Sequence, residues 1–386
     1  MVFCSRCLCR TRAYDQVMNV LLKRPGLRWL APLAVLATVA TAGLIGTNAS
    51  ADVTLPDIDA QTLLTKVGEA QPAGLSGTVE ESASLGLPSL GTDQSSSDFS
   101  TLISGTHTLR VAYAGPDKAR IAVNGSLGES DLVTNGTDQW VWSSDKNTVT
   151  HRSGTAVQNR KSPKSTEVPL TPSEAASRAL TAVGDTTDVT LAKNVSVAGR
   201  PSYELVLTPK ASQVGTKVDS VRIAVDGTTF VPLSVQLLVK GTDVPAFSTR
   251  FTKVDYAVPA ASTFTFKTPK GAKVTEVKGE AARAHQSGTK ADHAKRPTGT
   301  AADVKQVGSG WTTVVVSKVP SGTTAQAGQG RDARQFTQAL NSLPKVSGTW
   351  GSGRLLSGTA FSAVLTDDGR LAVGAVTPEL LYAALS

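Results

Sequence analysis

The sequence predicts an α+β fold that is mainly antiparallel β-sheet, with a second, small α+β module at the C-terminus. Apolar and polar residues alternate with a period of two over most of the chain, as they do in strands that bury one face. Segments of hairpin-turn chemistry separate these strands, which favours a meandering antiparallel sheet over a doubly wound one. Residues 279–300 contain no large apolar side chain, which indicates a linker between two folded parts.

Composition excludes several classes of protein. The chain has 386 residues, of which 40% are hydrophobic, so wholesale disorder and collagen-like repetition are ruled out. Its net charge is +8, but the first 51 residues hold six Lys and Arg residues against the single acid Asp15. The remainder has 33 basic and 30 acidic residues, a net charge of +3, and no basic stripe with interleaved aromatic residues. Nucleic-acid binding is therefore not expected.

The N-terminus has the pattern of an export signal. Residues 29–46 carry no charge and follow a short basic segment, as in a signal peptide. Ala49 and Ala51 supply the small residues of an A-x-A site, so cleavage is predicted after Ala51. An uncleaved N-terminal membrane anchor is the alternative, because about 18 residues is near the lower bound for crossing a bilayer. Both interpretations place the rest of the chain outside the cytoplasm, either secreted or anchored on the outer face of the cytoplasmic membrane.

The three cysteines, Cys4, Cys7 and Cys9, all precede the apolar run. They lack a second pair at the spacing of a structural zinc site, so no metal site is predicted. Met18 begins a more ordinary signal peptide, and we expect translation to start there. The exported protein would then contain no cysteine, and so neither a disulfide nor an acylated cysteine.

The first predicted elements after the leader are a helix and a strand. Residues 57–71 have helical periodicity, and Asp57 or Asp59 can cap the helix. A strand is predicted near 77–85, followed by a serine-rich loop.

The next elements are strands whose alternation defines one apolar face each. They are predicted at residues 106–114, 119–125, 139–143, 203–207, 221–225, 233–237 and 247–251. The candidate residues on their apolar faces are Leu109, Val111, Tyr113, Ile121, Val123, Trp140, Trp142, Leu205, Leu207, Val221, Ile223, Leu233, Val235, Leu237, Phe247 and Phe251. Alternation does not distinguish a filled core from a hollow face, because both need apolar side chains on one side. A hollow face would favour alkyl chains, at about 0.8 kcal/mol for each buried methylene.

One helix interrupts these strands. Thr171, Pro172 and Glu174 form a capping box with proline at the first helical position, and the helix is predicted to end near Val183. Together with the helix at 57–71, it is a candidate lid.

Beyond the linker, the sequence predicts a strand at 311–319, a helix near 331–343, a hairpin and a final helix. The hairpin pairs 359–366 with 371–376 around the Asp367-Asp368-Gly369 turn, and the last helix covers 378–385.

No catalytic constellation emerges from the sequence. The four histidines are His107, His151, His285 and His293, and the last two lie in the linker. No zinc-protease motif, nucleophile elbow or phosphate-binding loop is present. The adjacent acids Glu80 and Glu81 would point to opposite faces of a strand. We therefore predict no catalytic residue, metal or cofactor, and no enzyme activity; a hydrolase would need a serine beside His107 or His151.

Three segments carry a resemblance to a known family: residues 73–78 (AGLSGT), 109–117 (LRVAYAGPD) and 135–142 (NGTDQWVW). Together with the export signal they resemble actinobacterial LolA-like proteins, within the LolA, LppX and RseB superfamily of cell-envelope proteins. The resemblance covers roughly residues 55 to 278. It implies a curved, incomplete β-barrel (a half β-barrel) whose mouth is covered by helices and whose concave face binds acyl chains.

The predicted organisation is residues 1–51 as signal peptide or anchor, 52–278 as the LolA-like domain, 279–302 as a flexible linker and 303–386 as the C-terminal module. The resemblance implies a non-enzymatic, monomeric carrier of lipid or lipoprotein acyl chains, with the apolar residues above lining the cavity. The two-domain plan is closer to RseB, which makes an envelope sensor acting through a membrane protein partner the alternative.

Overall fold

The computed structural model describes residues 54–86, 102, 104–125, 128–154, 171–181, 184–278, 304–318, 338 and 340–386. Several predictions lie outside these ranges: the export segment with Ala49 and Ala51, the three cysteines, most of the serine-rich loop, nearly all of the linker and most of the helix near 331–343. Among the described helices, none has the length and apolar character needed to cross a membrane.

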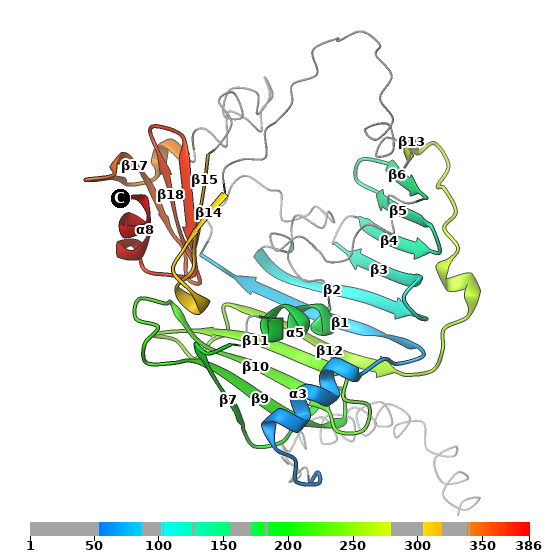
Figure 1. Cartoon of the computed structure of the whole chain (residues 1–386). Coiled ribbons are helices and arrows are strands. Elements are labelled where there is room, and N and C mark those ends of the chain that lie inside the picture. Colours follow the sequence, from blue (N-terminus) through cyan, green and yellow to red (C-terminus); the bar gives the residue numbers. More distant parts are fainter. Residues whose placement is uncertain are drawn as a thin grey trace, which may run out of the picture. The chain divides into compact units, whose positions relative to one another are not determined.

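The larger sheet confirms the predicted antiparallel meander (Figure 1). Its strands are β1 (Leu75–Ser84), β2 (Ser104–Tyr113), β3 (Lys118–Asn124), β4 (Glu129–Asn135), β5 (Asp138–Ser143), β6 (Thr148–Ser153), β7 (Thr187–Leu191), β8 (Val195–Val197), β9 (Arg200–Pro209), β10 (Val218–Asp226), β11 (Pro232–Val239), β12 (Phe247–Asp255) and β13 (Lys273–Lys278). The order is β13-β6-β5-β4-β3-β2-β1-β12-β11-β10-β9-β7, with β8 paired to β9. Every pair is antiparallel except β13 with β6, which the alternation did not predict.

Strand β1 joins the two halves of this sheet, because it pairs with β2 on one side and with β12 on the other. A β-bulge interrupts the β1–β12 register between Thr78 and Val79. At Gly77 a Cβ atom would collide with the carbonyl oxygen of Lys253 and the ring of Phe251, so this close approach requires glycine. Among the described strands the sheet curves but ends at β13 and β7 without closing, which confirms an incomplete barrel.

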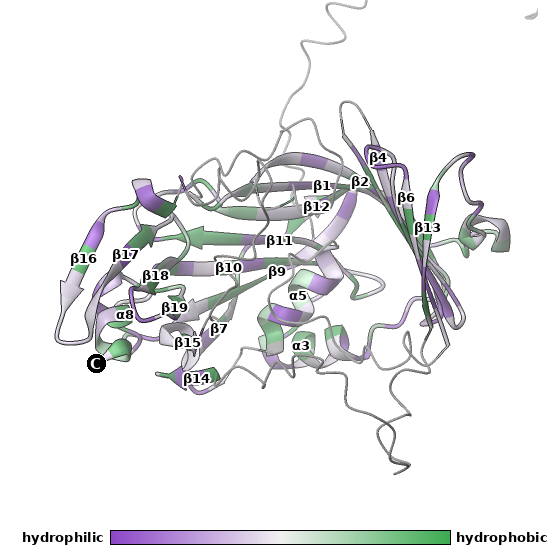
Figure 2. Ribbon diagram, turned by 90° about the horizontal axis from the view of Figure 1, so that it is seen from above, coloured by the Kyte–Doolittle hydropathy of each residue, from purple (hydrophilic) through white to green (hydrophobic). Residues whose placement is uncertain are grey.

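Two helices lie near one another against one face of the sheet (Figure 2). Helix α3 (Ala60–Glu69) is capped by Asp59, whose Oδ1 accepts from the backbone N–H of Thr62 at 2.9 Å. Helix α5 (Pro172–Thr181) begins after Thr171, whose Oγ1 accepts from the N–H of Glu174 at 3.2 Å. Both predicted helices and their caps are confirmed. The contacts of α5 are chiefly with β11 and β12.

The smaller sheet contains β14 (Val304–Val307), β15 (Val314–Lys318), β16 (Lys345–Gly348), β17 (Gly351–Ser357), β18 (Ser362–Thr366) and β19 (Arg370–Gly374). Their order is β14-β15-β19-β18-β17-β16, and α8 (Pro378–Leu385) packs on β15, β18 and β19. The predicted hairpin and final helix are confirmed. The strand predicted from Trp311 begins instead at Val314, because Trp311 lies in the 3-10 helix η5 (Gly310–Thr312).

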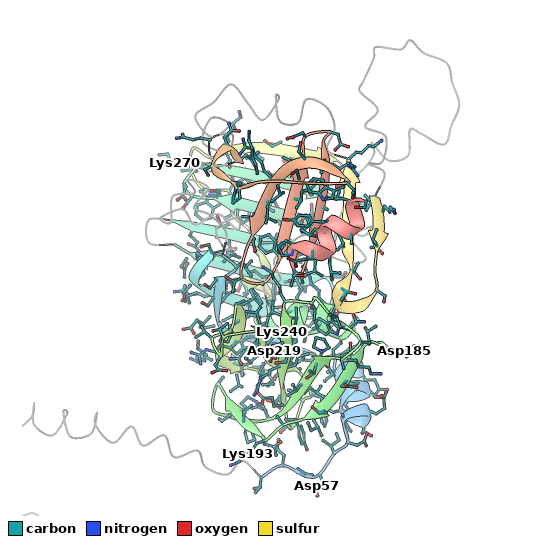
Figure 3. The ribbon with its side chains drawn as sticks, turned by 90° about the vertical axis from the view of Figure 1, so that its left-hand side faces the viewer. Asp57, Asp185, Lys193, Asp219, Lys240 and Lys270 are labelled. Atoms are coloured by element: carbon teal, nitrogen blue, oxygen red, sulfur yellow. The ribbon has the colours of Figure 1, made fainter. Side chains whose placement is uncertain are left out.

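Hydrogen bonds join the smaller sheet to the larger one. The ammonium of Lys217 on the larger sheet donates to the carbonyl oxygen of Gly358 at 2.6 Å and to Ser357 Oγ at 3.1 Å. The indole N–H of Trp311 donates to Thr187 Oγ1 at 2.9 Å. The charged side chains of Asp57, Asp185 and Lys193 are exposed, and Figure 3 shows them at the periphery.

Candidate functional site

The strand register assigns each apolar side chain to a face of the larger sheet. Directly opposed residues of antiparallel strands point to the same side. Val79 is opposed by Leu109 on one side and by Phe251 on the other. We call the side that bears these three residues the inner face. The helices α3 and α5 pack against it, because Leu63, Ala175 and Ala176 share its apolar clusters.

The inner face carries two apolar clusters. One includes Leu205, Leu207, Ile223 and Val235 with the buried residues of α3 and α5. The other includes Leu75, Val79, Leu109, Val123 and Phe251. Side chains fill the first cluster, since Leu205, Leu207 and Ile223 have no exposed surface. The inner face is therefore packed at that end.

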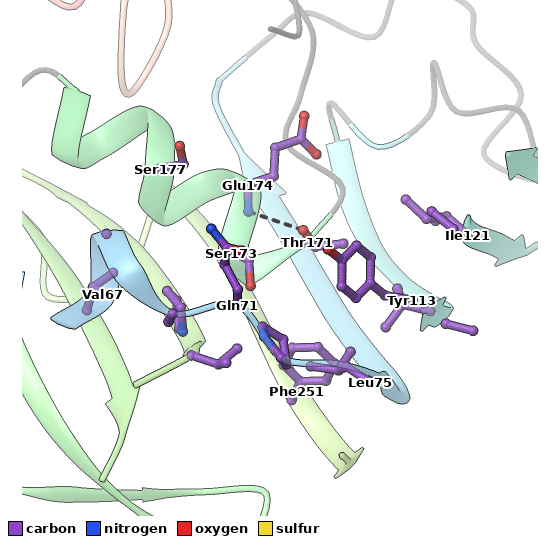
Figure 4. A pocket seen from close by; sticks show the side chains of 18 of the residues that line it. Val67, Gln71, Leu75, Tyr113, Ile121, Thr171, Ser173, Glu174, Ser177 and Phe251 are labelled. Atoms are coloured by element: carbon purple, nitrogen blue, oxygen red, sulfur yellow. Dashed lines mark hydrogen bonds between the residues drawn. The ribbon is translucent and has the colours of Figure 1, made fainter. Parts of the chain in front are cut away.

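A cavity of about 690 Å³ opens between the inner face and the two helices. The residues labelled around it in Figure 4 are Val67, Gln71, Leu75, Tyr113, Ile121, Thr171, Ser173, Glu174, Ser177 and Phe251. Strand side chains make its floor largely apolar, whereas the serine and threonine hydroxyl groups come from α5 and the residue before it. An apolar cleft of this size with a few polar groups at one side is typical of a small-molecule site, for which volumes of about 300 to 1,000 Å³ are usual.

The described charged groups at the cavity already have partners. The carboxylate of Glu174 accepts from Arg178 Nη2 at 2.9 Å. Arg120 donates through Nε to Asp131 Oδ1 at 3.1 Å and through Nη1 to the carbonyl oxygen of Thr263 at 3.3 Å. The hydrogen bond to Asp131 raises the pKa of Arg120 despite its partial burial. Ligand binding in this cavity would therefore depend mainly on apolar contact.

The cavity brings together four of the residues predicted to line it: Val111, Tyr113, Ile121 and Phe251. Leu109, Val123 and Leu233 are fully buried beside them in the same apolar cluster. The remaining predicted residues of strands β9 to β12 lie in the cluster beneath the helices; they are Leu205, Leu207, Val221, Ile223, Val235, Leu237 and Phe247. None of these seven lines the cavity.

Trp140 and Trp142 share a face with one another, as predicted, but it is the opposite face of the sheet. Along the rows of opposed residues, Val111 pairs with Ile121, then Leu132, then Val141. The tryptophans flank Val141 in β5 and so point away from the cavity. Trp140 stacks on His151 at 4.9 Å between ring centroids and on Phe266 at 6.0 Å.

His151 is fully engaged on that opposite face. Its Nε2 is 2.8 Å from Asp138 Oδ1, and its Nδ1 is 2.8 Å from Glu276 Oε2. These contacts tie β6 to β5 and to β13. Within the described residues, no group of three or more histidine, cysteine and acidic side chains is placed to hold a metal ion.

The alternation did not single out Glu81 as a candidate site residue. It lies on the inner face opposite Thr249, one row beyond Val79 and Phe251, and none of its surface is exposed. Burial raises the pKa of the Glu81 carboxyl to about 8. At neutral pH this group is therefore mostly a neutral acid. Its neighbour Glu80 points to the other face and pairs with Arg250 at 2.9 Å.

The chain was compared with protein families, curated sequences and solved structures. No protein-family model matches the sequence, and no curated protein sequence matches it. Among solved structures, the chain is similar to the Pseudomonas aeruginosa MucA/MucB complex, with 15% identity over 84% of this chain and 96% of that chain and a TM-score of 0.40.

Two single-protein structures are also similar. LprF from Mycobacterium bovis is 9% identical over 57% of this chain and 100% of that chain, with a TM-score of 0.30. A LolA superfamily protein from Nitrosomonas europaea is 12% identical over 54% and 99%, with a TM-score of 0.22. At these identities and TM-scores the similarity does not determine a function, and the proposal below rests on the cavity.

Proposed function

We propose that this protein is a non-enzymatic, extracytoplasmic carrier or binder of lipid or lipoprotein acyl chains. The observation that supports the proposal is the apolar cavity of about 690 Å³ between α3, α5 and the inner face. Val111, Tyr113, Ile121, Leu75 and Phe251 supply a continuous apolar floor from four strands.

The physical chemistry of this floor suits an alkyl chain. Each methylene that leaves water contributes about 0.8 kcal/mol, so ten methylenes contribute about 8 kcal/mol before the costs of binding are subtracted. Because the charged groups at the cavity, Arg120 and Glu174, already have partners in Asp131 and Arg178, they do not select a charged ligand. The extracytoplasmic location is proposed from the basic segment and apolar run of the N-terminus.

The proposal is tested by filling the cavity. Ile121→Trp should place an indole in it and reduce binding of the fluorescent probe N-phenyl-1-naphthylamine at least tenfold. Thr108→Trp is the matched control: it adds the same side chain on the adjacent strand β2, where Thr108 is exposed on the opposite face. Lipid extracted from protein purified out of its native host should be detectable by mass spectrometry. Equal probe binding by both variants, or no probe binding and no co-purified lipid, would contradict the proposal.

A second candidate is a sensor that acts through a membrane protein partner. The hydrogen bonds of Lys217 and Trp311 favour it, because they join the C-terminal sheet to the sheet that bears the cavity. A sensor should cross-link to one membrane protein, and added lipid should change the amount of this cross-linked product. A carrier should give the same cross-linking pattern with and without lipid. The Ile121→Trp variant separates the two, because it should abolish only an effect that requires the cavity.

A further inference from the structure

The inner face contains a pair of buried polar side chains that lack partners. Among the residues that the structure describes, both carboxyl oxygens of Glu81 and the hydroxyl of Thr249 are buried without a hydrogen-bond partner. Both residues have no exposed surface. They oppose one another directly across β1 and β12. Buried polar atoms are almost always paired, so two unpaired side chains in one row require an explanation.

The surroundings of the pair are apolar except for one histidine. On β1 it is flanked by Val79 and Ala83, and Val235 opposes Thr249 on β11. The remaining neighbour in the row is His107 on β2, whose Nε2 contacts the carbonyl oxygen of Ser104 at 2.9 Å. An apolar pair of the same volume would be more stable there, because an unpaired buried polar group costs about 1 to 3 kcal/mol.

The pair lies next to the cavity. Phe251 lines the cavity, and Thr249 is two residues away on the same face of the same strand. The rise of a strand separates the Cα atoms of two such residues by about 6.8 Å. Helix α5 covers both regions: Ser173 and Ser177 line the cavity, whereas Ala175 and Ala176 belong to the apolar cluster that includes Ala83 and Val235. The pair itself does not line the cavity, so an acyl ligand reaches it only when the side chains between Phe251 and α5 shift.

We propose that Glu81 and Thr249 form a buried subsite that binds the carbonyl oxygen of an ester or amide in an acyl ligand. This inference rests on the proposed function and specifies its ligand. A protonated carboxyl and a hydroxyl each supply one O–H donor, and a carbonyl oxygen has two lone pairs to accept them. The raised pKa of Glu81 keeps that donor in place at neutral pH.

Charged groups fit the row less well. An anionic headgroup brings a negative charge to an acidic side chain in an apolar setting, which is costly without a cation. A cationic amine would require Glu81 to ionise, and burying an ion pair costs desolvation of both charges. A neutral carbonyl satisfies the donors without burying a charge.

The test compares two lipids that differ at the carbonyl. Monopalmitoylglycerol and its ether analogue 1-O-hexadecylglycerol have the same headgroup and chain length, and each is titrated against N-phenyl-1-naphthylamine bound to the full chain. The native protein should bind the ester about tenfold more tightly than the ether. Glu81→Leu and Thr249→Val should bring this ratio close to one. Glu81→Gln should keep most of it, because the amide still donates, and Glu80→Gln is the matched control with the ratio unchanged.

The outcomes separate this inference from the proposed function. Equal binding of ester and ether by the native protein, or an undiminished ratio in Glu81→Leu and Thr249→Val, overturns the subsite while leaving acyl binding intact. Tighter binding of hexadecylamine than of the ester overturns it in favour of a cation site. If neither lipid displaces the probe, the proposed function fails, and the subsite fails with it.

Discussion

Replacing Glu81 by glutamine should change how the stability of this protein depends on pH. The carboxyl has a pKa of about 8 in the folded protein, against 4.5 for an exposed glutamate. An acid whose pKa is raised by folding favours the folded state fully below its unfolded pKa, and this contribution is lost as the pH rises towards the folded value. The native protein should therefore lose stability between about pH 4.5 and pH 8 on account of this residue.

The magnitude follows from the two pKa values. Each unit of difference corresponds to about 1.4 kcal/mol, so the full loss is about 5 kcal/mol, of which about 3 kcal/mol is reached by pH 7. Glutamine does not titrate, so Glu81→Gln should gain that amount over the native protein as the pH rises. Urea unfolding followed by far-UV circular dichroism at pH 4, 6, 7 and 8.5 measures the difference.

Glu80→Gln is the control for this experiment. It removes a carboxylate from the adjacent position, but Glu80 is half-exposed and its ion pair with Arg250 is at the surface, so the change should stay within about 1 kcal/mol. A stability difference between Glu81→Gln and the native protein that does not vary with pH would refute the reasoning, because it would mean that Glu81 is already ionised in the folded state.

Three further predictions concern side chains that hold the sheets together. Burial tends to raise the pKa of Asp226, but hydrogen bonds from Arg200 and two backbone N–H groups lower it overall. Asp226→Asn should therefore reduce the free energy of unfolding by about 3 kcal/mol, measured by urea unfolding at pH 7. The difference from the native protein should shrink as the pH falls below 3.8, because the native carboxylate is then protonated. His151→Gln should speed hydrogen exchange of β13, because it removes the contact with Glu276, while exchange in β10 stays unchanged. Arg370→Met removes hydrogen bonds to the carbonyl oxygens of Leu385 and Trp350, so proteolysis of α8 should become faster. An unchanged cleavage rate would show that these hydrogen bonds do not hold α8 in place.

Much of the fold follows from local chemistry. Asp59 and Thr171 cap the helices that their positions predict, because an N-cap depends on the few residues around it. Alternation likewise places Leu109 and Val111 on one face of β2, since the side-chain period of a strand is two. The hairpin of β18 and β19 follows from its turn, where Gly369 has a φ of 84°.

The pairing and register of distant strands do not follow from local chemistry. Alternation establishes that Trp140 and Trp142 share a face, but the face itself depends on the register of β2, β3, β4 and β5. A shift of one residue in any of these pairings would exchange the two faces. The same holds for the parallel pairing of β13 with β6, which depends on contacts 125 residues apart such as His151 with Glu276.

The adjacent acids Glu80 and Glu81 separate what the sequence determines from what depends on tertiary packing. Sequence alone implies that the two side chains point to opposite faces, because they are neighbours in a strand. Which of them is buried depends on α5, which lies more than 90 residues further along the chain and packs against the inner face but not the other. Burial and pKa are properties of the packed surroundings and not of the residue. For that reason the sequence could predict the strands and their apolar faces, whereas the cavity and the neutral acid beside it emerge only from the folded chain.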